Sequence, residues 1–480
     1  MRALLVSTYD LGRQPFGLAS PAAWLRAAGI DVACADASRG PISDEQFTAA
    51  SVIAFYLPMH TATRLAVPLI DRAREVNPSA RLCAYGLYAP LNGAWLRERG
   101  VEVLGPEAEQ ALVDLVKFQL PTSAFAEGSG ETSPKQRGGG PNSQSALSES
   151  PIANRKSQIV PRLRFITPDR AGLPPLADYA SLRMPDGTRR VIGSTDATRG
   201  CKHLCRHCPI VPVYEGQFRV VPLDVVMADV RAQVAAGAQH ISFGDPDFLN
   251  GPTHARHLID RVAAEFPGLS YDVTIKIEHL LKHPEMIPLL RGTGCLFICS
   301  AVESIDNAVL GHLRKGHTRS DFVEVARLCR EAGITLVPTF VAFTPWTTLE
   351  GYVELLDLLE EMDLVEQVAP IQLAIRLLVT AGSSLLELDD IRRVVSPFDA
   401  ASLTWPWRHD DPRVDRLQAA VMRLVGTVSA MPRAQAFAAI AALAREHADV
   451  PAPPPRTTRR GPVPYVSEPW YCCAEPMEVV

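Results

Sequence analysis

The sequence predicts an α/β protein with two successive parallel sheets, the second of them curled into a partial barrel. Short apolar runs alternate with helical stretches in two separate series, and a polar, low-complexity segment divides these series. The chain has 480 residues, of which 47% are hydrophobic and 21% are charged. This composition is typical of globular proteins with sizeable cores, and the length suggests about three domains of ~150 residues each.

The first series, residues 1–118, predicts a doubly wound domain of the flavodoxin or Rossmann type. Strands that alternate with helices indicate a parallel sheet covered on both faces. Such sheets bind ligands at the carboxyl ends of their strands. The expected strands are Ala3–Val6, Val32–Ala35, Val52–Tyr56, Leu82–Tyr85 and Val101–Leu104, and the expected helices include Pro21–Ala28, Ala62–Val76 and Glu107–Phe118.

Residues 119–161 are predicted to form a disordered linker. The stretch SGETSPKQRGGGPNSQSALSES contains almost no aliphatic residue. It cannot bury enough apolar surface to offset the entropy of ordering its backbone.

The second series, residues 162–380, predicts six strands that are each followed by a helix, and therefore a partial (β/α)6 barrel. The chemistry of such barrels takes place at the C-terminal ends of the strands. Residues 381–448 are expected to be mostly helical, and residues 449–480 form a Pro-rich tail that ends in WYCCAEPMEVV. The expected strands are Val191–Thr195, His240–Phe243, Tyr271–Ile275, Leu296–Ala301, Thr335–Phe340 and Ile371–Leu377, and the helices include Leu223–Ala236, Phe322–Ala332 and Thr348–Met362.

Charge and hydropathy argue against nucleic-acid and membrane partners. The formal net charge is −5 and no basic stripe dominates the sequence. No apolar run reaches the ~18 residues of a membrane helix, and the stretch before Asp10 is too short for a signal peptide. The expected location is the cytoplasm, where thiols stay reduced. The ten cysteines are therefore expected as metal ligands, catalytic groups or buried residues rather than as disulfides.

Three cysteines form the strongest motif in the chain. The segment TRGCKHLCRHCPI places Cys201, Cys205 and Cys208 on one loop between the first barrel strand and the first barrel helix. Three thiolates in this C-x3-C-x2-C spacing can bind three irons of a [4Fe–4S] cluster and leave the fourth iron open. The alternatives are a zinc site with His203 or His207 as the fourth ligand, and reduced thiols without metal.

This motif and its position resemble the radical SAM superfamily, in particular the branch with an N-terminal cobalamin-binding-like domain. The resemblance spans nearly the whole ordered chain. It implies that the open iron chelates S-adenosylmethionine (SAM) and that a cluster electron cleaves the sulfonium. The resulting 5′-deoxyadenosyl radical abstracts hydrogen from the substrate. The expected cofactors are therefore a [4Fe–4S] cluster and SAM, which the protein positions and shields from water.

The resemblance also implies SAM-binding residues around the cluster. The segment ISFGDPDF stands where the family has a turn that meets the methionyl ammonium. Gly244 would permit the close approach, and Asp245 or Asp247 would supply the acid. A loop with solvated acids is the alternative. His207 stands before the third cysteine, where the family usually has an aromatic carbocyclic residue that touches adenine, and its imidazole can still stack.

Two further polar residues are candidates at strand ends. Glu303 in AVESIDNAVLGHLRKGHT would hydrogen-bond ribose hydroxyls, and a helix-capping role for Ser304 and Asp306 is the rival interpretation. Lys276 ends the third strand and would contact SAM or substrate, with an ion pair to Glu278 as the alternative.

Cobalamin is a candidate third cofactor. Domains that displace the lower cobalt ligand use an Asp-x-His-x-x-Gly pattern, which this sequence lacks. His60 is the only histidine before residue 203, and it fits the start of a helix better than a ligand crevice. Either cobalamin binds without a protein histidine, or the N-terminal domain is a docking platform.

The ending Cys-Cys-Ala-Glu-Pro resembles that of a group of radical SAM proteins defined by this tail, some of which carry selenocysteine at the second position. Cys472 and Cys473 are vicinal thiols on an extended segment, and Trp470 and Tyr471 supply apolar area to dock it at the barrel mouth. We expect the pair to take part in turnover, with an inert docked tail as the alternative. Five other cysteines are expected in the core: Cys34, Cys83, Cys295, Cys299 and Cys329.

The predicted function is radical chemistry on an unidentified small-molecule or peptide substrate. Methyl transfer and sulfur- or selenium-group transfer are the candidate reactions, and the expected partner is an electron donor such as flavodoxin or ferredoxin. The alternative is a non-catalytic iron–sulfur or zinc protein that uses its N-terminal domain to bind a partner. Conversion of SAM to 5′-deoxyadenosine by reconstituted, dithionite-reduced protein separates the two functions.

Overall fold

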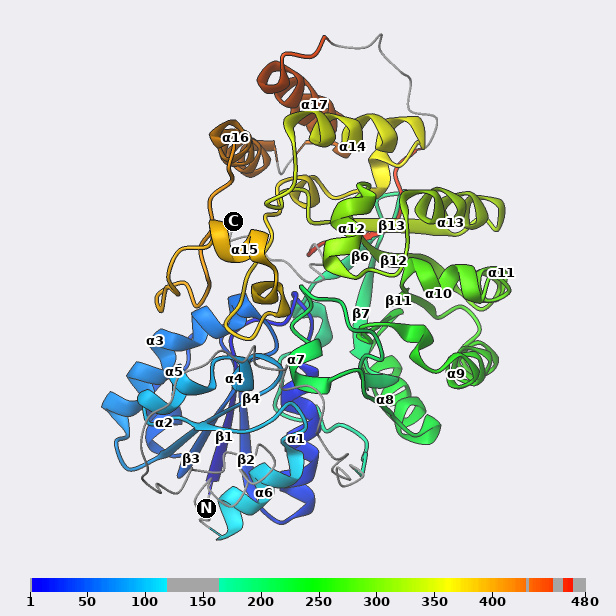
Figure 1. The fold of residues 1–480 in the computed structure, drawn as a ribbon. Helices are drawn as coiled ribbons and strands as arrows, with labels where there is room; N and C mark the ends of the chain where they lie inside the picture. Colours follow the sequence, from blue (N-terminus) through cyan, green and yellow to red (C-terminus); the bar gives the residue numbers. More distant parts are fainter. Residues whose placement is uncertain (1, 119–163, 429–430, 452–460, 469–480) are drawn as a thin grey trace, which may run out of the picture.

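The computed structural model describes residues 2–118, 164–428, 431–451 and 461–468. The predicted linker lies outside the described residues, as do Trp470, Tyr471, Cys472 and Cys473. Figure 1 shows the N-terminal sheet domain beside the barrel, with the last long helices beyond the barrel. No helix in the described part of the chain is both long enough and apolar enough to span a membrane.

Residues 2–118 form a five-stranded parallel sheet with helices on both faces, as predicted. Alternate side chains enter opposite cores, with Leu4 and Val6 on one face of the sheet and Ala3 and Leu5 on the other. The strand order is β2-β1-β3-β4-β5, so the direction of winding reverses at β1 and β3, where such sheets bind ligands. The strands are β1 (Arg2–Ser7), β2 (Asp31–Asp36), β3 (Val52–Tyr56), β4 (Arg81–Tyr85) and β5 (Glu102–Val103), and the helices are α1 (Phe16–Ala27), α2 (Asp44–Thr48), α3 (His60–Val76), α4 (Tyr88–Leu91), α5 (Gly93–Glu98) and α6 (Glu109–Phe118).

The second sheet curls into a partial barrel (Figure 1), and its first five parallel strands coincide with the predicted runs. Two short antiparallel strands, β6 and β14, extend the sheet beyond β7, and β8 pairs with β9 in a separate hairpin. The strands are β6 (Ser181–Arg183), β7 (Arg189–Thr195), β8 (Thr198–Gly200), β9 (Phe218–Val220), β10 (His240–Phe243), β11 (Ser270–Thr274), β12 (Cys295–Glu303), β13 (Thr335–Phe340) and β14 (Tyr465–Val466). The helices are α7 (Val211–Tyr214), α8 (Leu223–Ala235), α9 (Pro252–Glu265), α10 (Ile277–Lys282), α11 (Met286–Gly292), α12 (Asn307–Leu313), α13 (Arg319–Glu331), α14 (Leu349–Glu361), α15 (Asp389–Val394), α16 (Pro412–Val428) and α17 (Arg433–Ala448).

The sixth predicted strand, Ile371–Leu377, is wrong. The segment opens with a 3-10 helix, η6 (Pro370–Leu373), and then pairs only through one parallel bridge between Phe343 and Arg376. Pro370 favours this start because its ring fixes φ and it has no N–H for a sheet. The helix η6 packs against α16 and α17, so the apolar residues of the segment serve burial against helices rather than a strand.

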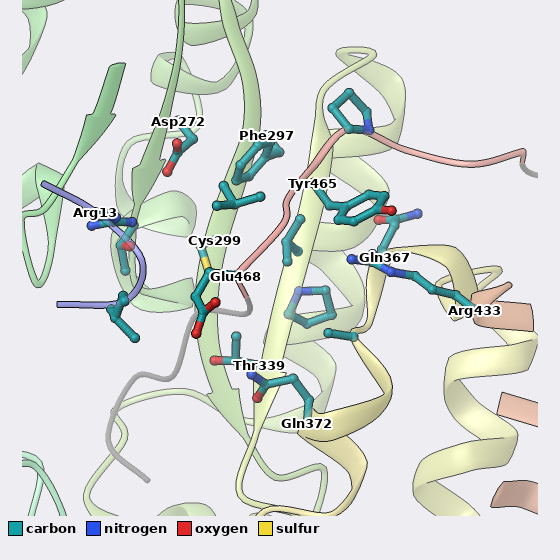
Figure 2. Close-up of a pocket in the computed structure, with 17 residues that line it drawn as sticks. Arg13, Asp272, Phe297, Cys299, Thr339, Gln367, Gln372, Arg433, Tyr465 and Glu468 are labelled. Atoms are coloured by element: carbon teal, nitrogen blue, oxygen red, sulfur yellow. The ribbon is translucent and has the colours of Figure 1, made fainter. Parts of the chain in front are cut away.

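The strand β14 lies across the open side of the barrel. It pairs with β6, and Val466 packs with Leu182, Ile192 and Phe297 in a small apolar cluster. Figure 2 shows this segment passing over a cavity of about 60 Å³ that is walled by β11, β12 and β13. The last described residues of the chain therefore belong to the barrel wall.

Buried ion pairs and hydrogen bonds join the two sheets. Arg199 on β8 pairs with Glu109 on α6, and Ser20 on α1 accepts from Arg199 at 2.9 Å and donates to Glu109 at 2.8 Å. Arg170 donates to Gln14 Oε1 at 3.0 Å from the barrel side. Because a buried charge without its partner costs several kcal/mol, these contacts fix how the domains meet.

We expect Glu109→Ala to lower the free energy of unfolding by about 3–5 kcal/mol, because it leaves the buried Arg199 guanidinium without its carboxylate. Urea denaturation followed by circular dichroism measures the loss. The matched control is Glu324→Ala, which removes an exposed partner of Arg327 and should leave the midpoint nearly unchanged. Equal effects of the two substitutions would contradict a special role for the buried pair.

Candidate functional site

The three predicted cluster ligands line one cavity. Cys201, Cys205 and Cys208 face a hollow of about 260 Å³ that is walled by both the barrel and the N-terminal domain. Cys201 and Cys205 are buried, whereas Cys208 is partly exposed. All three belong to the loop between β8 and α7, at the end of the barrel where the parallel strands finish. The structure thus brings the three thiols together around one space.

The cysteine loop starts at a position that only glycine fits. Gly200 has a left-handed backbone (φ +78°), and a Cβ there would lie 2.5 Å from the Tyr214 ring and 2.6 Å from the Gln217 carbonyl oxygen. Glycine avoids both the strain and the clash. The backbone can therefore turn sharply out of β8 into the loop.

Hydrogen bonds from two neighbouring segments hold the loop. Asn250 Nδ2 donates to the Gly200 carbonyl at 3.2 Å, and Asn250 Oδ1 accepts from the Lys202 N–H at 3.3 Å. On the other side, the Arg206 N–H donates to the Leu313 carbonyl at 3.0 Å. These bonds preset the loop before any metal binds, which lowers the entropy cost of binding.

The chemistry of the thiols fits a metal cluster. Burial raises the pKa of Cys201 to about 12, so its thiolate requires a nearby positive charge. Lys276 Nζ lies 3.7 Å from Cys205 Sγ, and a bound metal would supply the remaining charge. Lys276 also lies 3.4 Å from Glu278 Oε2, so the alternative ion pair is present, and the contact of Lys276 with SAM or substrate stays a prediction. Among the described residues, Cys208 completes the set and no fourth cysteine lines the cavity, as expected for a cluster with one open iron.

The histidines of the motif face carboxylates. His203 Nε2 lies 3.3 Å from Asp247 Oδ2 and its Nδ1 lies 3.6 Å from Glu278 Oε2, while His207 Nε2 lies 3.2 Å from Glu303 Oε1. A zinc-binding histidine must direct a ring nitrogen at the metal between the thiolates. If the three thiols bound zinc instead, His207 Nδ1 is the ring nitrogen of the motif that remains as a candidate fourth ligand.

Glu303 is buried beside the cavity and orients two of its lining residues. The register of β12 shifts after Ala301, and Glu303 has a left-handed backbone (φ +68°). Although burial raises it, the net pKa of Glu303 is about 2 because Lys315, at 3.4 Å, and His207 stabilise the carboxylate. The predicted ribose contact of Glu303 stays a prediction. Asp306 caps α12, as the rival interpretation of this segment expected.

Asp245 ties two strand ends together. Its Oδ2 accepts from the Ala197 N–H at 2.9 Å and its Oδ1 accepts from the Thr198 hydroxyl at 2.6 Å. Burial, with a contribution from Asp196, raises the pKa of Asp245 to about 7. The carboxylate thus fixes the backbone at the start of β8.

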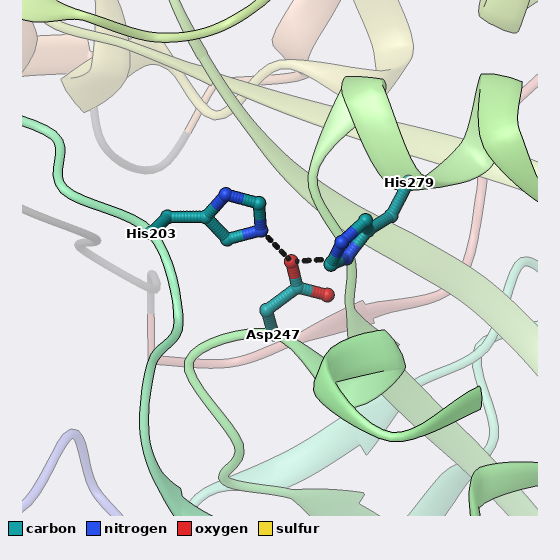
Figure 3. A group of neighbouring side chains, drawn as sticks. All are labelled: His203, Asp247 and His279. Atoms are coloured by element: carbon teal, nitrogen blue, oxygen red, sulfur yellow. Dashed lines mark ion pairs between the residues drawn. The ribbon is translucent and has the colours of Figure 1, made fainter. Parts of the chain in front are cut away.

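Figure 3 shows Asp247 between the imidazoles of His203 and His279. Asp247 Oδ2 lies 2.7 Å from His279 Nδ1, and the Leu249 N–H donates to Oδ1 at 3.1 Å. Although burial opposes it, the two imidazoles lower the pKa of Asp247. The three ligand atoms lie within 4.8 Å of one another, so the group could hold a cation. We assign it to fixing the cysteine loop against the start of α10.

The turn between these acids reaches the cavity through Gly244 and Pro246, which line it. A Cβ on Gly244 would lie 2.6 Å from Asp196 Oδ1, so the close approach predicted for this glycine is to a neighbouring carboxylate. The contact of Asp245 or Asp247 with the SAM ammonium stays a prediction.

The N-terminal domain completes the cavity with residues that sequence reasoning missed. Asp10, Arg13 and Phe16 follow β1, and Tyr56 ends β3, so the cavity lies at the point where the winding reverses. Burial raises the pKa of Asp10 to about 7 and that of Asp196 to about 6, against the opposing effect of nearby arginines. Asp10, Arg13 and Phe16 could have been found from the sequence, because they come soon after the first predicted strand.

A second cavity of about 190 Å³ opens over the N-terminal sheet. Its floor is filled, since a Cβ on Gly17 would lie 2.1 Å from the Tyr56 ring and the Tyr85 hydroxyl donates to the Gly17 carbonyl at 2.7 Å. Both cavities are smaller than the roughly 300–1,000 Å³ pockets of drug-sized ligands. A corrinoid is larger than either cavity, and the binding of cobalamin stays a prediction. His60 begins α3, as expected, and its Nε2 lies 2.7 Å from the Ser402 carbonyl oxygen.

Comparison with known families gives the barrel its identity. Residues 196–359 match the Radical SAM superfamily. This stretch is a radical SAM domain. It begins just before the cysteine loop and ends within α14, so the three thiols and strands β10 to β13 belong to it.

Two curated proteins similar to this chain are named for tRNA and for a ribosomal protein. A tRNA-2-methylthio-N(6)-dimethylallyladenosine synthase from Chlorobium luteolum is 28% identical over 170 residues, which cover 32% of this chain and 36% of that protein. A ribosomal protein uS12 methylthiotransferase RimO from Methylococcus capsulatus is 28% identical over 209 residues, which cover 39% of this chain and 48% of that protein. The chain thus spans about a third to a half of the length of these relatives.

Solved structures with a similar fold extend over more of the chain. The cobalamin-dependent S-adenosylmethionine radical enzyme OxsB matches 89% of this chain and 67% of its own chain, with a TM-score of 0.64 and 13% identity. The radical S-adenosylmethionine methyltransferase TsrM from Kitasatospora setae matches 75% and 71%, with a TM-score of 0.55 and 19% identity. At these identities the likeness shows the fold alone, and it supports the α/β architecture described above.

We expect Gly200→Ala to reduce cluster content, because a side chain at φ +78° adds about 1–3 kcal/mol of strain and displaces the start of the cysteine loop. Iron and acid-labile sulfide per chain measure the effect after anaerobic reconstitution. The matched control is Gly187→Ala, which has the same kind of backbone (φ +83°) but no atom within 4 Å of the new Cβ. Equal cluster content in the two variants would contradict the role given to Gly200.

Proposed function

We propose that the protein is a radical SAM enzyme in which Cys201, Cys205 and Cys208 hold a [4Fe–4S] cluster. The observation that carries this proposal is that the three thiols of the radical SAM domain line one cavity together with two buried lysines. When bound, the cluster supplies the electron that cleaves SAM and so starts the radical reaction. The protein places the reactants and shields them from water.

Two buried lysines line this side of the cavity, each beside a carboxylate. Lys276 lies beside Cys205, and Lys315 lies beside Glu303 and His207. We assign Lys276 to an anionic group of SAM or substrate, because a charge-assisted hydrogen bond in a buried site is among the stronger polar contacts.

The remaining predicted residues have distinct proposed roles. His207 precedes Cys208 and lines the cavity, with its ring held by Glu303, so we retain it as the residue that stacks on adenine. The turn from Gly244 to Asp247 is the proposed site for the methionyl end of SAM. Its backbone reaches the cavity, while its two carboxylates hold the surrounding loops.

The N-terminal domain excludes water from the reacting groups. Arg13, Phe16 and Tyr56 cover the cavity from the side opposite the barrel strands. Burial of this kind strengthens electrostatic contacts inside the cavity and protects a radical from solvent.

Methyl transfer and sulfur-group transfer are the proposed reactions, in keeping with the names of the relatives and of the fold neighbours. The proposed substrate is a small molecule or peptide, the electron donor is a flavodoxin or ferredoxin, and the location is the cytoplasm. Two relatives are named for tRNA and a ribosomal protein, so the expected absence of a nucleic-acid partner stays a prediction.

Replacement of Cys201, Cys205 and Cys208 together by Ala should abolish the visible absorbance of reconstituted protein, because it removes the three proposed cluster ligands that line the cavity. It should also abolish conversion of SAM to 5′-deoxyadenosine after reduction with dithionite. The control is Cys329→Ala, which removes a buried thiol of α13 outside the cavity. A full cluster in the triple variant would refute the proposed site, and a wild-type cluster that never cleaves SAM would favour the non-catalytic alternative.

Replacement of Asp245 or Asp247 by Asn should weaken SAM binding about tenfold, because each carboxylate holds the turn that is the proposed site for the methionyl end of SAM, and a hydrogen bond to a charged group contributes roughly 1.5–3 kcal/mol. Equilibrium binding to reconstituted protein gives the affinity, and circular dichroism shows that the variants remain folded. Asp186→Asn, in an exposed turn after β6, is the control. Wild-type affinity in both variants would remove this turn from the SAM site.

A further inference from the structure

His203, Asp247 and His279 form a buried group that three separate segments of the chain bring together. His203 stands between Cys201 and Cys205 in the cysteine loop, Asp247 follows β10, and His279 lies in the first turn of α10. The side chains of Asp247 and His279 are 0% and 1% exposed, and that of His203 is 12% exposed. Polar groups at this depth are normally paired, so each of them calls for a partner.

The ring nitrogens and the carboxylate oxygen of this group converge without a hydrogen bond of suitable direction. Asp247 Oδ2 lies 2.7 Å from His279 Nδ1 and 3.3 Å from His203 Nε2 (Figure 3). Within the part of the chain that the structure describes, none of these three atoms has a hydrogen-bond partner, and neither has His279 Nε2. Buried donors and acceptors left in this state destabilise a fold. A partner that all three converging atoms can share would remove most of this cost.

The ligand types and their spacing match those of a zinc site. Two histidines and one carboxylate are a ligand set of zinc sites, whereas magnesium and calcium prefer oxygen. Iron(II) with this set keeps several open positions, for which a group this buried leaves little room. Atoms bound to zinc are about 2.0–2.2 Å from it, so two ligands of a tetrahedral ion are about 3.4 Å apart. The three atoms here are 2.7 Å, 3.3 Å and at most 4.8 Å apart, a range that includes this spacing.

The surroundings hold the three side chains in the orientation that a metal ion needs. The Leu249 N–H donates to Asp247 Oδ1 at 3.1 Å, which leaves Oδ2 directed at the imidazoles. His203 Nδ1 faces Glu278 Oε2 at 3.6 Å, and metal-bound histidines commonly turn their second nitrogen to a carboxylate. Gly316 (φ +76°) makes room for Glu278, since a Cβ there would lie 2.6 Å from Oε2. The group therefore has both the ligands and the supporting contacts of a metal site.

We propose that His203 Nε2, Asp247 Oδ2 and His279 Nδ1 bind a zinc ion in a site separate from the [4Fe–4S] cluster. The ion joins the cysteine loop to the turn after β10 and to α10, and so fixes the backbone between Cys201 and Cys205. Its fourth position is left to water on the side where His203 lines the cavity. None of the three ligands is a thiol, so the site goes beyond the proposed function and does not depend on it.

The first test measures the zinc content of the anaerobic holoenzyme after incubation with zinc chloride and removal of loosely bound metal by gel filtration. Inductively coupled plasma mass spectrometry counts zinc and iron separately, and we expect about one zinc per chain in addition to the iron of the cluster. His279→Gln should weaken zinc binding at least about tenfold, because it removes one of three ligands. Absence of zinc from wild type, or equal zinc in wild type and His279→Gln, would overturn the proposal.

The matched control is His283→Gln, a partly exposed histidine just after α10 that lies 3.4 Å from Glu285 and should bind zinc as wild type does. Circular dichroism shows whether His279→Gln is folded. His203→Gln removes the most exposed of the three ligands and gives the same comparison with less disturbance of the core. Full zinc binding in a folded His203→Gln would likewise overturn the proposal.

The second test identifies the ligands by X-ray absorption at the zinc edge of the same holoenzyme, where the iron of the cluster does not interfere. Zinc lies about 2.0–2.1 Å from nitrogen and oxygen but about 2.3 Å from sulfur, so the two kinds of ligand are distinguishable. We expect a shell of nitrogen and oxygen without sulfur. A sulfur shell would place the zinc on the cysteines and overturn the proposal.

Iron content and SAM cleavage in these preparations keep the two conclusions apart. A cluster that forms 5′-deoxyadenosine in a protein without bound zinc refutes the zinc site alone. Zinc on nitrogen and oxygen ligands in a protein that forms no cluster supports the zinc site and refutes the proposed function.

Discussion

The buried carboxylate of Asp245 joins the end of β10 to the backbone that leads into the cysteine loop. It accepts from the Ala197 N–H and from the Thr198 hydroxyl, so the first residues of β8 have their polar groups satisfied inside the protein. A buried carboxylate without these hydrogen bonds would lower the stability of the fold by several kcal/mol. The backbone conformation that forms both bonds is therefore favoured, and it sets the direction in which the loop starts. The position of the three thiols follows from this constraint, because Cys201 stands only three residues after Thr198.

The same short strand, β8, also contacts the N-terminal domain. Arg199 follows Thr198 and pairs with Glu109 across the junction, so the segment that carries the cysteine loop also carries the buried ion pair. The cavity at the cysteines is closed by Arg13, Phe16 and Tyr56, and it exists as an enclosed space only when this junction is formed. The N-terminal domain thus forms a wall of the cavity that the three cysteines line, with its switch point facing the barrel.

The strands and the cysteine loop could be predicted because their signals are local. Buried parallel strands have continuous apolar runs in the sequence, and the C-x3-C-x2-C motif contains all three proposed cluster ligands within eight residues. The prediction of a sixth strand at Ile371–Leu377 was wrong because burial against α16 and α17 requires the same apolar pattern as a buried strand. The partners of Asp245 and Asp247 could not be predicted either, since a buried acid takes whichever donors the tertiary fold brings to it. Arg13 was missed because it lies almost two hundred residues before Cys201 and meets it only after the domains pack.

Lysines and acids line different sides of the cavity. Lys276 and Lys315 lie on the barrel side with the thiols, whereas Asp10 and Asp196 lie toward the N-terminal domain. Burial raises the pKa of Asp10 to about 7 and that of Asp196 to about 6, although Arg13 lies near both acids and opposes the shift. Each lysine lies beside a carboxylate, Lys276 beside Glu278 and Lys315 beside Glu303, so an anionic group of a reactant would compete with that carboxylate for the ammonium.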